Sequence, residues 1–460
     1  MSKHNTNRNR GAAIITAVMF FVVITVAIAV GISSPVVREY KTSRDFEKSK
    51  GAYYLSEAGH EDALYRLKEG TTIGAQEVIS LGGNVATTTI TNIGGGKSIG
   101  SIGDILTNTR RVKSMLTTSS GISFNYGVQA GDGGVLMDNT ASITGNLYSR
   151  GPVCGGGQTG TDCLNGVAAG DNSISGTVYV ATTTSNGVIT NITNQLSGTA
   201  SMYANKIYSS FIASSTVTCN TISGSNRSSC TYPLGTQTPL AFPISDTQVL
   251  EWEAAAEAGG VATAAECPGG KYSINSTVTL GPIKIPCDLE ISGTAKVNLM
   301  GPVWVTTGLG GTANISIKNS TEINVDPSLG AQSVAIIADP GSATRATGGS
   351  IALENNITFN QAAGSNANAY VLLLSWNTGA SLGTSAEAIE VNNSVLGNLL
   401  VYAGYGDIKI ENNASLREVT GYKITLKNSA NVIYSAGLEN TLFTSGPGGS
   451  WVISDWKEGQ

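Results

Sequence analysis

The sequence predicts a long amino-terminal α-helix, first transmembrane and then amphipathic, followed by a mainly β extracellular region. Three observations support this fold class. Residues 11–37 form an apolar run, residues 38–68 continue with a helical pattern, and short alternating strands recur from residue 121 onward. The recurring strands favour a parallel β-helix, or solenoid, and a β-sandwich is the alternative.

The uncharged run at residues 11–37 is expected to cross a membrane. A helix needs roughly 20 apolar residues to span the hydrocarbon core, and the run supplies them. The leader at residues 1–11 contains basic residues and no acidic residue. The positive-inside rule therefore places the amino terminus in the cytoplasm and the rest of the chain outside. An ordinary single-pass anchor and a signal peptide cleaved before Val30 are the alternatives.

Residues 38–68 are expected to extend this helix, so that residues 12–70 form one rod. Apolar residues recur there close to whole helical turns, beside charged flanks, which predicts a single apolar stripe. The members of the stripe are Phe46, Tyr53, Leu64 and Leu67. The first half of the rod is apolar all round and the second half is amphipathic, so the two halves suit different solvents.

The basic leader, the Gly before the apolar run and the long helix ending in SEAGHEDALYRL resemble the amino-terminal region of type IV pilin-like proteins. The similarity is greatest to PilX-type minor pilins and to the K-type minor pseudopilin of type II secretion, and it covers residues 1–70. It implies that a prepilin peptidase cleaves after Gly11 and leaves Ala12 as a methylated amino terminus. It also implies that the helix lies in inner-membrane lipid before assembly and then packs against other pilin-like subunits. The packing residues would be Phe20, Phe21, Val22, Val23 and Ile24.

The chain departs from the pilin pattern at the fifth position of the expected mature protein. Major pilins usually carry Glu there, whereas this chain has Thr16. In the family that carboxylate neutralises the amino-terminal ammonium of a neighbouring subunit, inside an apolar core where an unpaired charge is costly. The resemblance therefore implies a minor, tip or assembly-initiating subunit rather than the repeating one.

Composition indicates a β-rich extracellular surface and argues against nucleic acid as a partner. Of 460 residues 57 are Gly and only 13% are charged, and the formal net charge is −5. Loss of the three basic leader residues makes the mature chain −5 − 3 = −8. No basic block remains outside the leader, and nucleic-acid binding needs one.

The six cysteines all lie on the outer side of the membrane segment, where disulfides persist. Pairing between nearest neighbours gives short loops, and the other connectivities remain open. The proposed pairs are Cys154 with Cys163, Cys219 with Cys230, and Cys267 with Cys287. No CxxC pair with matching His predicts a zinc site, so neither a metal nor a cofactor is expected.

Residues 71–240 are predicted to be a β-rich region with disulfides. An S-I-x-G element at Ser142 returns 31 residues later at Ser173, each time followed by a short strand. Residues 241–262 then predict a helix that caps or links β-domains, with a capping box between Ser245 and Gln248 and a left-handed stop at Gly259. A domain boundary is expected at this helix.

Residues 263–460 are predicted to be a solenoid-like repeat domain. Five segments alternate apolar and polar residues and end in Asn, which suits a bend. They begin at Ile315, Ile351, Ile389, Ile408 and Ile424. Stacking them in register places Glu390 over Lys409 and Glu411 over Lys427. The terminal segment with Trp451, Ile453 and Trp456 is expected to cap the last coil.

Catalysis is not expected. Parallel β-helix enzymes need carboxylates clustered in one groove. The candidate glutamates of this chain are sufficiently explained by ion pairs with neighbouring strands or by exposure to solvent. These candidates are Glu354, Glu390 and Glu411. The resemblance implies instead a non-enzymatic structural subunit of a type IV pilus or related secretion filament, with a β-rich head at the cell surface that could meet surface glycans or cells. The alternatives are a monomeric membrane-anchored surface adhesin and a carbohydrate-active β-helix enzyme.

Overall fold

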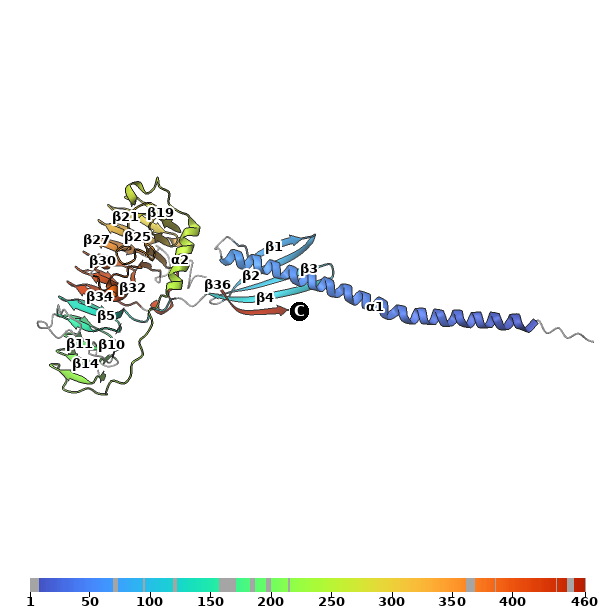
Figure 1. Cartoon of the computed structure of the whole chain (residues 1–460), viewed down its shortest axis with the longest axis horizontal. Helices are drawn as coiled ribbons and strands as arrows, with labels where there is room; N and C mark the ends of the chain where they lie inside the picture. Colours follow the sequence, from blue (N-terminus) through green and yellow to red (C-terminus); the bar gives the residue numbers. More distant parts are fainter. Residues whose placement is uncertain are drawn as a thin grey trace, which may run out of the picture. The chain divides into compact units, whose positions relative to one another are not determined.

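The chain forms two compact units in a computed structural model (Figure 1). The helix–sheet unit comprises Met1–Thr118 and Trp451–Gln460, and the head comprises Ser119–Ser450. The structure describes residues 8–68, 73–93, 96–118, 122–156, 171–182, 187–195, 200–213, 216–360, 369–384, 386–435, 437–444 and 451–459.

The helix–sheet unit consists of one long helix, α1 (Arg8–Lys68), and one antiparallel sheet of five strands. The strands in spatial order are β1 (Gln76–Leu81), β2 (Asn84–Ile93), β3 (Gly96–Ile105), β4 (Asn108–Thr118) and β36 (Trp451–Gly459). The expected cap formed by the terminal segment is therefore wrong. β36 instead satisfies the open edge of β4, with Trp451 opposite Thr118.

Three ladders of parallel strands, here called the stack, build the head. The first ladder contains β20 (Ile283–Ile285), β23 (Val303–Val305), β26 (Val334–Ala338), β29 (Val371–Ser375), β32 (Leu399–Ile410), β34 (Glu418–Lys427), β5 (Val128–Asp138), β7 (Leu147–Ser149), β10 (Val178–Val180), β13 (Ser201–Tyr203) and β16 (Thr216–Thr218).

The second ladder shares the long strands β32, β34 and β5 with the first. Its other strands are β18 (Lys271–Ile274), β21 (Asp288–Ile291), β24 (Ile315–Lys318), β27 (Ile351–Glu354), β30 (Glu387–Asn392), β8 (Val153–Gly155), β11 (Val188–Thr190), β14 (Lys206–Tyr208) and β17 (Thr221–Ser223).

The third ladder is the separate 11-stranded sheet. It contains β19 (Val278–Leu280), β22 (Lys296–Leu299), β25 (Glu322–Val325), β28 (Thr358–Asn360), β31 (Leu396–Gly397), β33 (Ser415–Leu416), β35 (Asn431–Ile433), β6 (Ser142–Thr144), β9 (Ser173–Ile174), β12 (Thr193–Asn194) and β15 (Phe211–Ile212). Short 3-10 helices lie between strands: η1 (Pro268–Gly270), η2 (Pro327–Leu329), η3 (Ala380–Leu382) and η4 (Leu438–Asn440).

The strand register confirms the repeat predicted from the sequence. The first residues of the five repeats lie opposite one another on successive parallel strands, in the order Ile315, Ile351, Ile389, Ile408 and Ile424. The earlier repeat is confirmed too, since Ser142 lies opposite Ser173. Inward-facing apolar side chains of all three ladders form one buried core.

The asparagines that end the repeats form a hydrogen-bonded ladder at the bend. Each has positive φ, which Asn tolerates better than most residues. Along the ladder each side-chain amide donates to the next carbonyl oxygen: Asn393 to Asn355 (3.0 Å), Asn412 to Asn393 (3.1 Å), Asn428 to Asn412 (2.9 Å) and Asn139 to Asn428 (2.8 Å).

One of the two predicted charge pairs forms. The Lys409 ammonium lies 3.4 Å from Glu390 on the neighbouring strand, as predicted. Glu411, expected to pair with Lys427, lies 3.1 Å from Lys409 instead. The reason is that side chains two residues apart on a strand lie on the same face. Lys409 therefore already stands beside Glu411.

The predicted domain boundary at residues 241–262 is wrong, because the stack is continuous across it. β5 pairs with β34, so residues 128–223 continue the ladders that residues 271–433 begin. The chain thus enters the stack at its middle, builds outward to β17, crosses to β18 at the other end and builds back. The pairing gives both β34 and β5 a neighbour and leaves no open edge at the join.

The crossing runs along the outer face of the stack as a strap (residues 233–245) followed by α2 (Asp246–Gly259). Outward side chains of the first ladder bond the strap: the Tyr402 hydroxyl donates to the Ile244 carbonyl at 2.8 Å, and the Gln129 amide donates to the Ala241 carbonyl at 2.9 Å. The predicted capping box of Ser245 and Gln248 is present. The helix ends one residue later than predicted.

Candidate functional site

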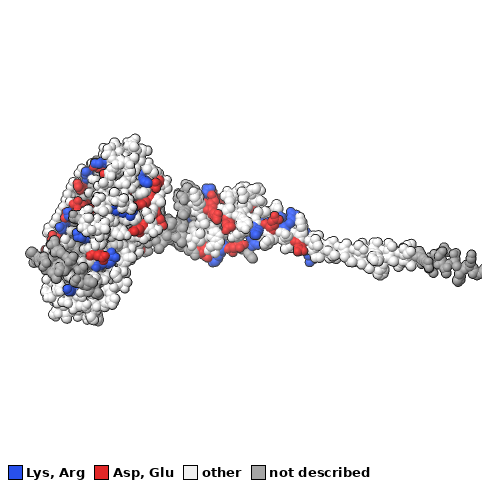
Figure 2. Space-filling view, in the orientation of Figure 1, with Lys and Arg blue, Asp and Glu red and all other residues white. Residues whose placement is uncertain are grey.

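The first part of α1 exposes an apolar surface that the rest of the described chain does not cover. Of the described residues, one helix, Ala13–Leu67, is long and apolar enough to cross a membrane by length and composition. Figure 2 shows no charged residue on the visible face of this part, and charges begin where the helix continues toward the sheet. The predicted packing residues are all exposed: Phe20, Phe21, Val22, Val23 and Ile24.

Exposed apolar area of this extent is unfavourable in water, at about 25 cal/mol for each Å². Soluble monomers rarely show contiguous apolar patches larger than a few hundred Å². The first part of α1 therefore needs lipid or other apolar helices around it.

The predicted processing residues lie in the first turns of α1. Gly11 and Ala12 belong to the helix that begins at Arg8, and Thr16 lies on its exposed surface. Polar side chains further along bond the helix backbone instead of solvent. The Thr25 hydroxyl donates to the Phe21 carbonyl at 2.7 Å, and such bonds lower the cost of a hydroxyl in an apolar medium.

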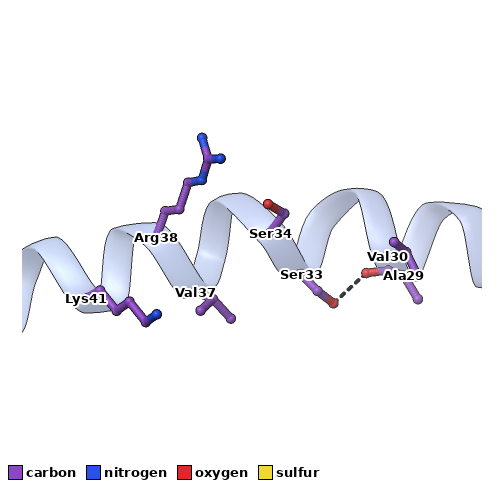
Figure 3. A pocket seen from close by; sticks show the side chains of 7 residues that line it. All are labelled: Ala29, Val30, Ser33, Ser34, Val37, Arg38 and Lys41. Carbon is purple, nitrogen blue, oxygen red and sulfur yellow. Dashed lines mark hydrogen bonds between the residues drawn. The ribbon is translucent and has the colours of Figure 1, made fainter.

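A shallow hollow marks the change from the uncharged to the charged part of α1 (Figure 3). Its lining comes from one helix only: Ala29, Val30, Ser33, Ser34, Val37, Arg38 and Lys41. The Ser33 hydroxyl bonds the Ala29 carbonyl, and the Arg38 and Lys41 side chains lie on opposite sides of the ribbon. Ligand sites need polar groups that converge in a concave pocket. This hollow does not supply that arrangement.

The second part of α1 packs on the sheet through small residues. Gly59 faces β2 and β3 so closely that an added Cβ would lie 2.8 Å from the Ser101 hydroxyl and 2.9 Å from the Thr88 hydroxyl. Ala52 and Ala63 are fully buried in the same contact. Small side chains let helix and strand backbones approach, and the contact fixes α1 to the sheet.

The predicted apolar stripe of α1 is therefore displaced. Phe46 is exposed, and the other three residues are only half-buried. The large residues flank the contact because the helix lies too close to the sheet for them at its centre. The missed signal was the spacing of small residues, four, three and four apart, at Ala52, Ser56, Gly59 and Ala63.

His60 is the buried polar group of this contact. Its side chain is 0% exposed, its Nε2 lies 2.8 Å from the Ser114 hydroxyl, and its ring packs edge-on against Trp456. Nδ1 has no hydrogen-bond partner among the described residues. Burial lowers the pKa of His60 from 6.5 to about 4, so the imidazole is neutral in the folded unit.

The helix–sheet unit is expected to lose stability as the pH falls from about 6.5 to about 4. In this window the unfolded chain binds a proton on His60 that the folded unit does not bind, so the free energy of unfolding falls by up to about 3 kcal/mol. Thermal unfolding of the full-length protein in detergent at pH 7.5 and pH 4.5 measures it. In the non-titrating variant His60→Gln this share of the loss should vanish, and an unchanged loss would contradict the assignment.

The disulfides form where nearest-neighbour pairing places them. Cys219 bonds Cys230, and Cys267 bonds Cys287. Cys154 is disulfide-bonded as well, and its expected partner, Cys163, lies outside the described residues.

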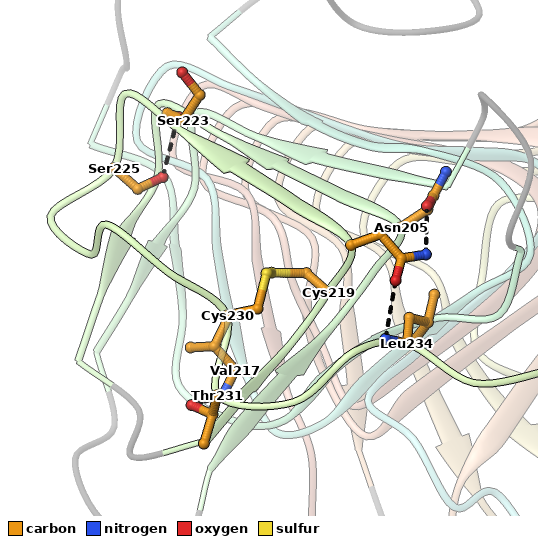
Figure 4. The surroundings of a disulfide bond; sticks show 9 residues. Asn205, Val217, Cys219, Ser223, Ser225, Cys230, Thr231 and Leu234 are labelled. Carbon is orange, nitrogen blue, oxygen red and sulfur yellow. Dashed lines mark hydrogen bonds between the residues drawn. A yellow bond between two sulfur atoms is a disulfide. The ribbon is translucent and has the colours of Figure 1, made fainter.

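The Cys219–Cys230 disulfide fastens the chain back onto the end of the stack (Figure 4). The Thr231 amide donates to the Val217 carbonyl at 2.7 Å, and the Leu234 amide donates to the Asn220 side chain at 3.2 Å. The first bond pairs a backbone carbonyl of β16 that the end of the stack would leave open, and the second holds the returning chain to the Asn220 side chain.

The carboxylates considered for catalysis do not converge in a groove. Glu390 and Glu411 both lie near the Lys409 ammonium, at 3.4 and 3.1 Å, while Glu354 is exposed at the end of β27. Among the described residues no group of three His, Cys, Asp or Glu is placed to hold a metal ion. The buried carboxyl groups among the described residues are elsewhere: Glu253 on α2, Asp339 after β26 and Glu418 on β34.

The comparisons with known proteins add a distant structural likeness. No protein-family model matches the chain, and no curated protein matches it. Among solved structures the chain matches the competence-associated pilin ComZ from Thermus thermophilus, at 14% sequence identity and a TM-score of 0.29, over 90% of this chain and 97% of that chain. A TM-score this low does not establish a shared fold.

Proposed function

We propose that the chain is a non-enzymatic, pilin-like structural subunit of a type IV pilus or a related secretion filament. One observation carries this proposal: α1 is a single helix whose first part is apolar and uncovered, while its second part is fixed to its own sheet. Such a helix can lie in inner-membrane lipid first and then pack against the helices of other subunits, without a change in the fold that it carries.

The head is proposed to be a parallel β-helix displayed at the cell surface. Support comes from three ladders of parallel strands in register around one apolar core, with the asparagine ladder at a bend. The ion pairs of Glu390 and Glu411 with Lys409 support a structural role for these carboxylates rather than catalysis.

A tip or assembly-initiating position is proposed from Thr16. The amino-terminal ammonium of each processed subunit needs a carboxylate partner in the apolar core of a filament, because an unpaired charge there is costly. Thr16 cannot supply this carboxylate to a neighbouring subunit. This chain therefore fits the position in the filament at which no further subunit docks on it and requires the missing carboxylate. Replacement of Thr16 by Glu would restore the pattern of the repeating subunit.

Processing and location test the proposal together. Mass spectrometry of the mature amino terminus is expected to show a cut after Gly11 with a methylated Ala12, and the chain is expected in sheared surface filaments. Gly11→Ser is expected to block cleavage and to remove the chain from the filament fraction. Gly31→Ser is the matched control, since it lies in the same helix and an added Cβ there meets nothing within 4 Å.

Two outcomes would overturn the proposal. An intact leader on a chain that stays in the inner membrane would indicate a monomeric membrane-anchored surface adhesin. A mature protein that starts at Val30 would indicate a secreted protein that has lost the first, apolar part of α1.

A further inference from the structure

A buried carboxyl group joins α2 to the stack. Glu253 lies on the inner side of α2 and is only 5% exposed. It is held there by its neighbours on the helix, since Trp252 is fully buried with its ring 4.9 Å from that of Phe443. Glu253 cannot turn to solvent while α2 stays in place.

The group that faces Glu253 is a second carboxyl, Asp339, which follows β26 and is 2% exposed. Asp339 is held as an anion. Arg345 donates to it from Nε at 2.8 Å and from Nη2 at 2.7 Å, and the Gly341 amide donates at 2.9 Å. The Arg345 guanidinium also stacks 3.6 Å from the Trp376 ring centroid, so its position is fixed.

Glu253 hydrogen-bonds to Asp339. Two carboxyl groups in hydrogen-bond contact need one proton between them, because two buried like charges repel. Since Asp339 already accepts three bonds as an anion, the proton belongs to Glu253. Burial, and then the charge of Asp339, raises the pKa of Glu253 to about 8.

The other charges near α2 do not neutralise Glu253. Lys284 on β20 is bonded to Glu257 at 2.8 Å and lies over the Trp304 ring, while Arg345 is committed to Asp339; both lower the pKa of Glu253 less than burial raises it. Asp246, at the start of α2, accepts from the Tyr405 hydroxyl at 3.0 Å.

We propose that the proton between Glu253 and Asp339 is a latch that fastens α2 to the head, and that the latch weakens as the pH rises from acid to neutral, because opening of the helix releases this proton. Release uncovers the outer face of the first ladder beneath α2. Because the helix alone lifts, the three ladders and their core stay intact.

The sign of the pH dependence follows from the proton. Glu253 is neutral while α2 is closed and ionises at its ordinary pKa near 4.5 when α2 opens. Opening therefore releases one proton between about pH 4.5 and about pH 8. The equilibrium constant for opening rises by up to about tenfold for each pH unit in this window and levels off above it.

Amide hydrogen exchange on the full-length protein in detergent tests the latch. Opening constants for α2, corrected for the intrinsic exchange rate at each pH, are expected to rise by about 400-fold from pH 5 to pH 8. In Glu253→Gln the side-chain amide still donates to Asp339 but does not titrate, so the rise should disappear.

Glu257→Gln is the matched control. It makes the same substitution one turn along α2, at a carboxylate that is itself exposed, and it should keep the rise. Asp339→Asn provides a second variant, since it leaves Glu253 free to ionise beside Arg345 and should also remove the rise. Flat opening constants in the wild type, or a full rise in Glu253→Gln with the strands still protected, would overturn the proposal.

Discussion

Gly103→Ala is expected to lower the free energy of unfolding of the helix–sheet unit by about 3 kcal/mol. Gly103 lies on β3 against the backbone of α1, where an added Cβ would overlap the Ala52 carbonyl oxygen and lie 2.6 Å from the Ser56 amide nitrogen. Both are backbone atoms of the helix and cannot rotate away. The helix must therefore move off the sheet and give up contacts along β2, β3 and β4.

Gly100→Ala provides the control on the same strand. An added Cβ at Gly100 meets nothing within 4 Å, so this variant should change stability by less than about 1 kcal/mol. Thermal unfolding of the full-length protein in detergent, with amide exchange in β2–β4, separates the two variants. Equal losses would show that strand propensity, rather than contact with the helix, accounts for the effect.

Arg345→Met is expected to destabilise the head by about 3 kcal/mol. The substitution removes the partner of a buried carboxylate, Asp339, and the cation stacked on Trp376, while the apolar side chain keeps much of the volume. Removal of one partner of a buried pair leaves an uncompensated charge in a medium that solvates it poorly. Thermal unfolding of the head at pH 7 measures the loss.

A second substitution tests that cause. Arg345→Met combined with Asp339→Asn removes both charges and should recover a large part of the stability, so the two effects should not add. Arg417→Met is the control, because the Arg417 guanidinium is half-buried and bonds an uncharged side chain, that of Asn398, at 3.3 Å. If the double variant is no more stable than Arg345→Met, lost packing rather than the orphaned carboxylate explains the loss.

The repeats of the head could be predicted because in-register stacking leaves a direct mark on the sequence. Each repeat returns an apolar pair and an Asn to the same register position, so Ile389, Ile408 and Ile424 align in the sequence alone. The pairing of Cys219 with Cys230 and of Cys267 with Cys287 could be predicted from their closeness in the sequence, because segments that are neighbours in the sequence are also neighbours in the stack.

The order in which the repeats lie in the stack could not be predicted. A period in the sequence predicts that the repeats stack, but not which repeat lies next to which. β34 pairs with β5 across 289 residues at the asparagine ladder. α2 was taken for a boundary because a helix interrupts the strand rhythm. α2 interrupts the run of strands along the sequence but not the stack itself, because the chain crosses the outer face of one continuous stack through this helix.

The candidate site was only partly visible in the sequence. The uncharged run of α1 was evident, since composition and length suffice to recognise it. The close contact of Gly59 and Gly103 was hidden, because it depends on the pairing of two backbones far apart in the chain. The cluster of Glu253, Asp339 and Arg345 was hidden for a related reason: the proximity and burial of these three charged residues depend on the fold, not on their spacing in the sequence.

The head begins and ends between two strands that are hydrogen-bonded to each other. β4 ends at Thr118, β36 begins at Trp451, and these two residues face one another in the sheet. In topology the entire head is thus the loop of a β-hairpin that a two-residue turn would otherwise close. Exchange or deletion of the segment between Thr118 and Trp451 would therefore leave the pairing of β4 with β36 unchanged.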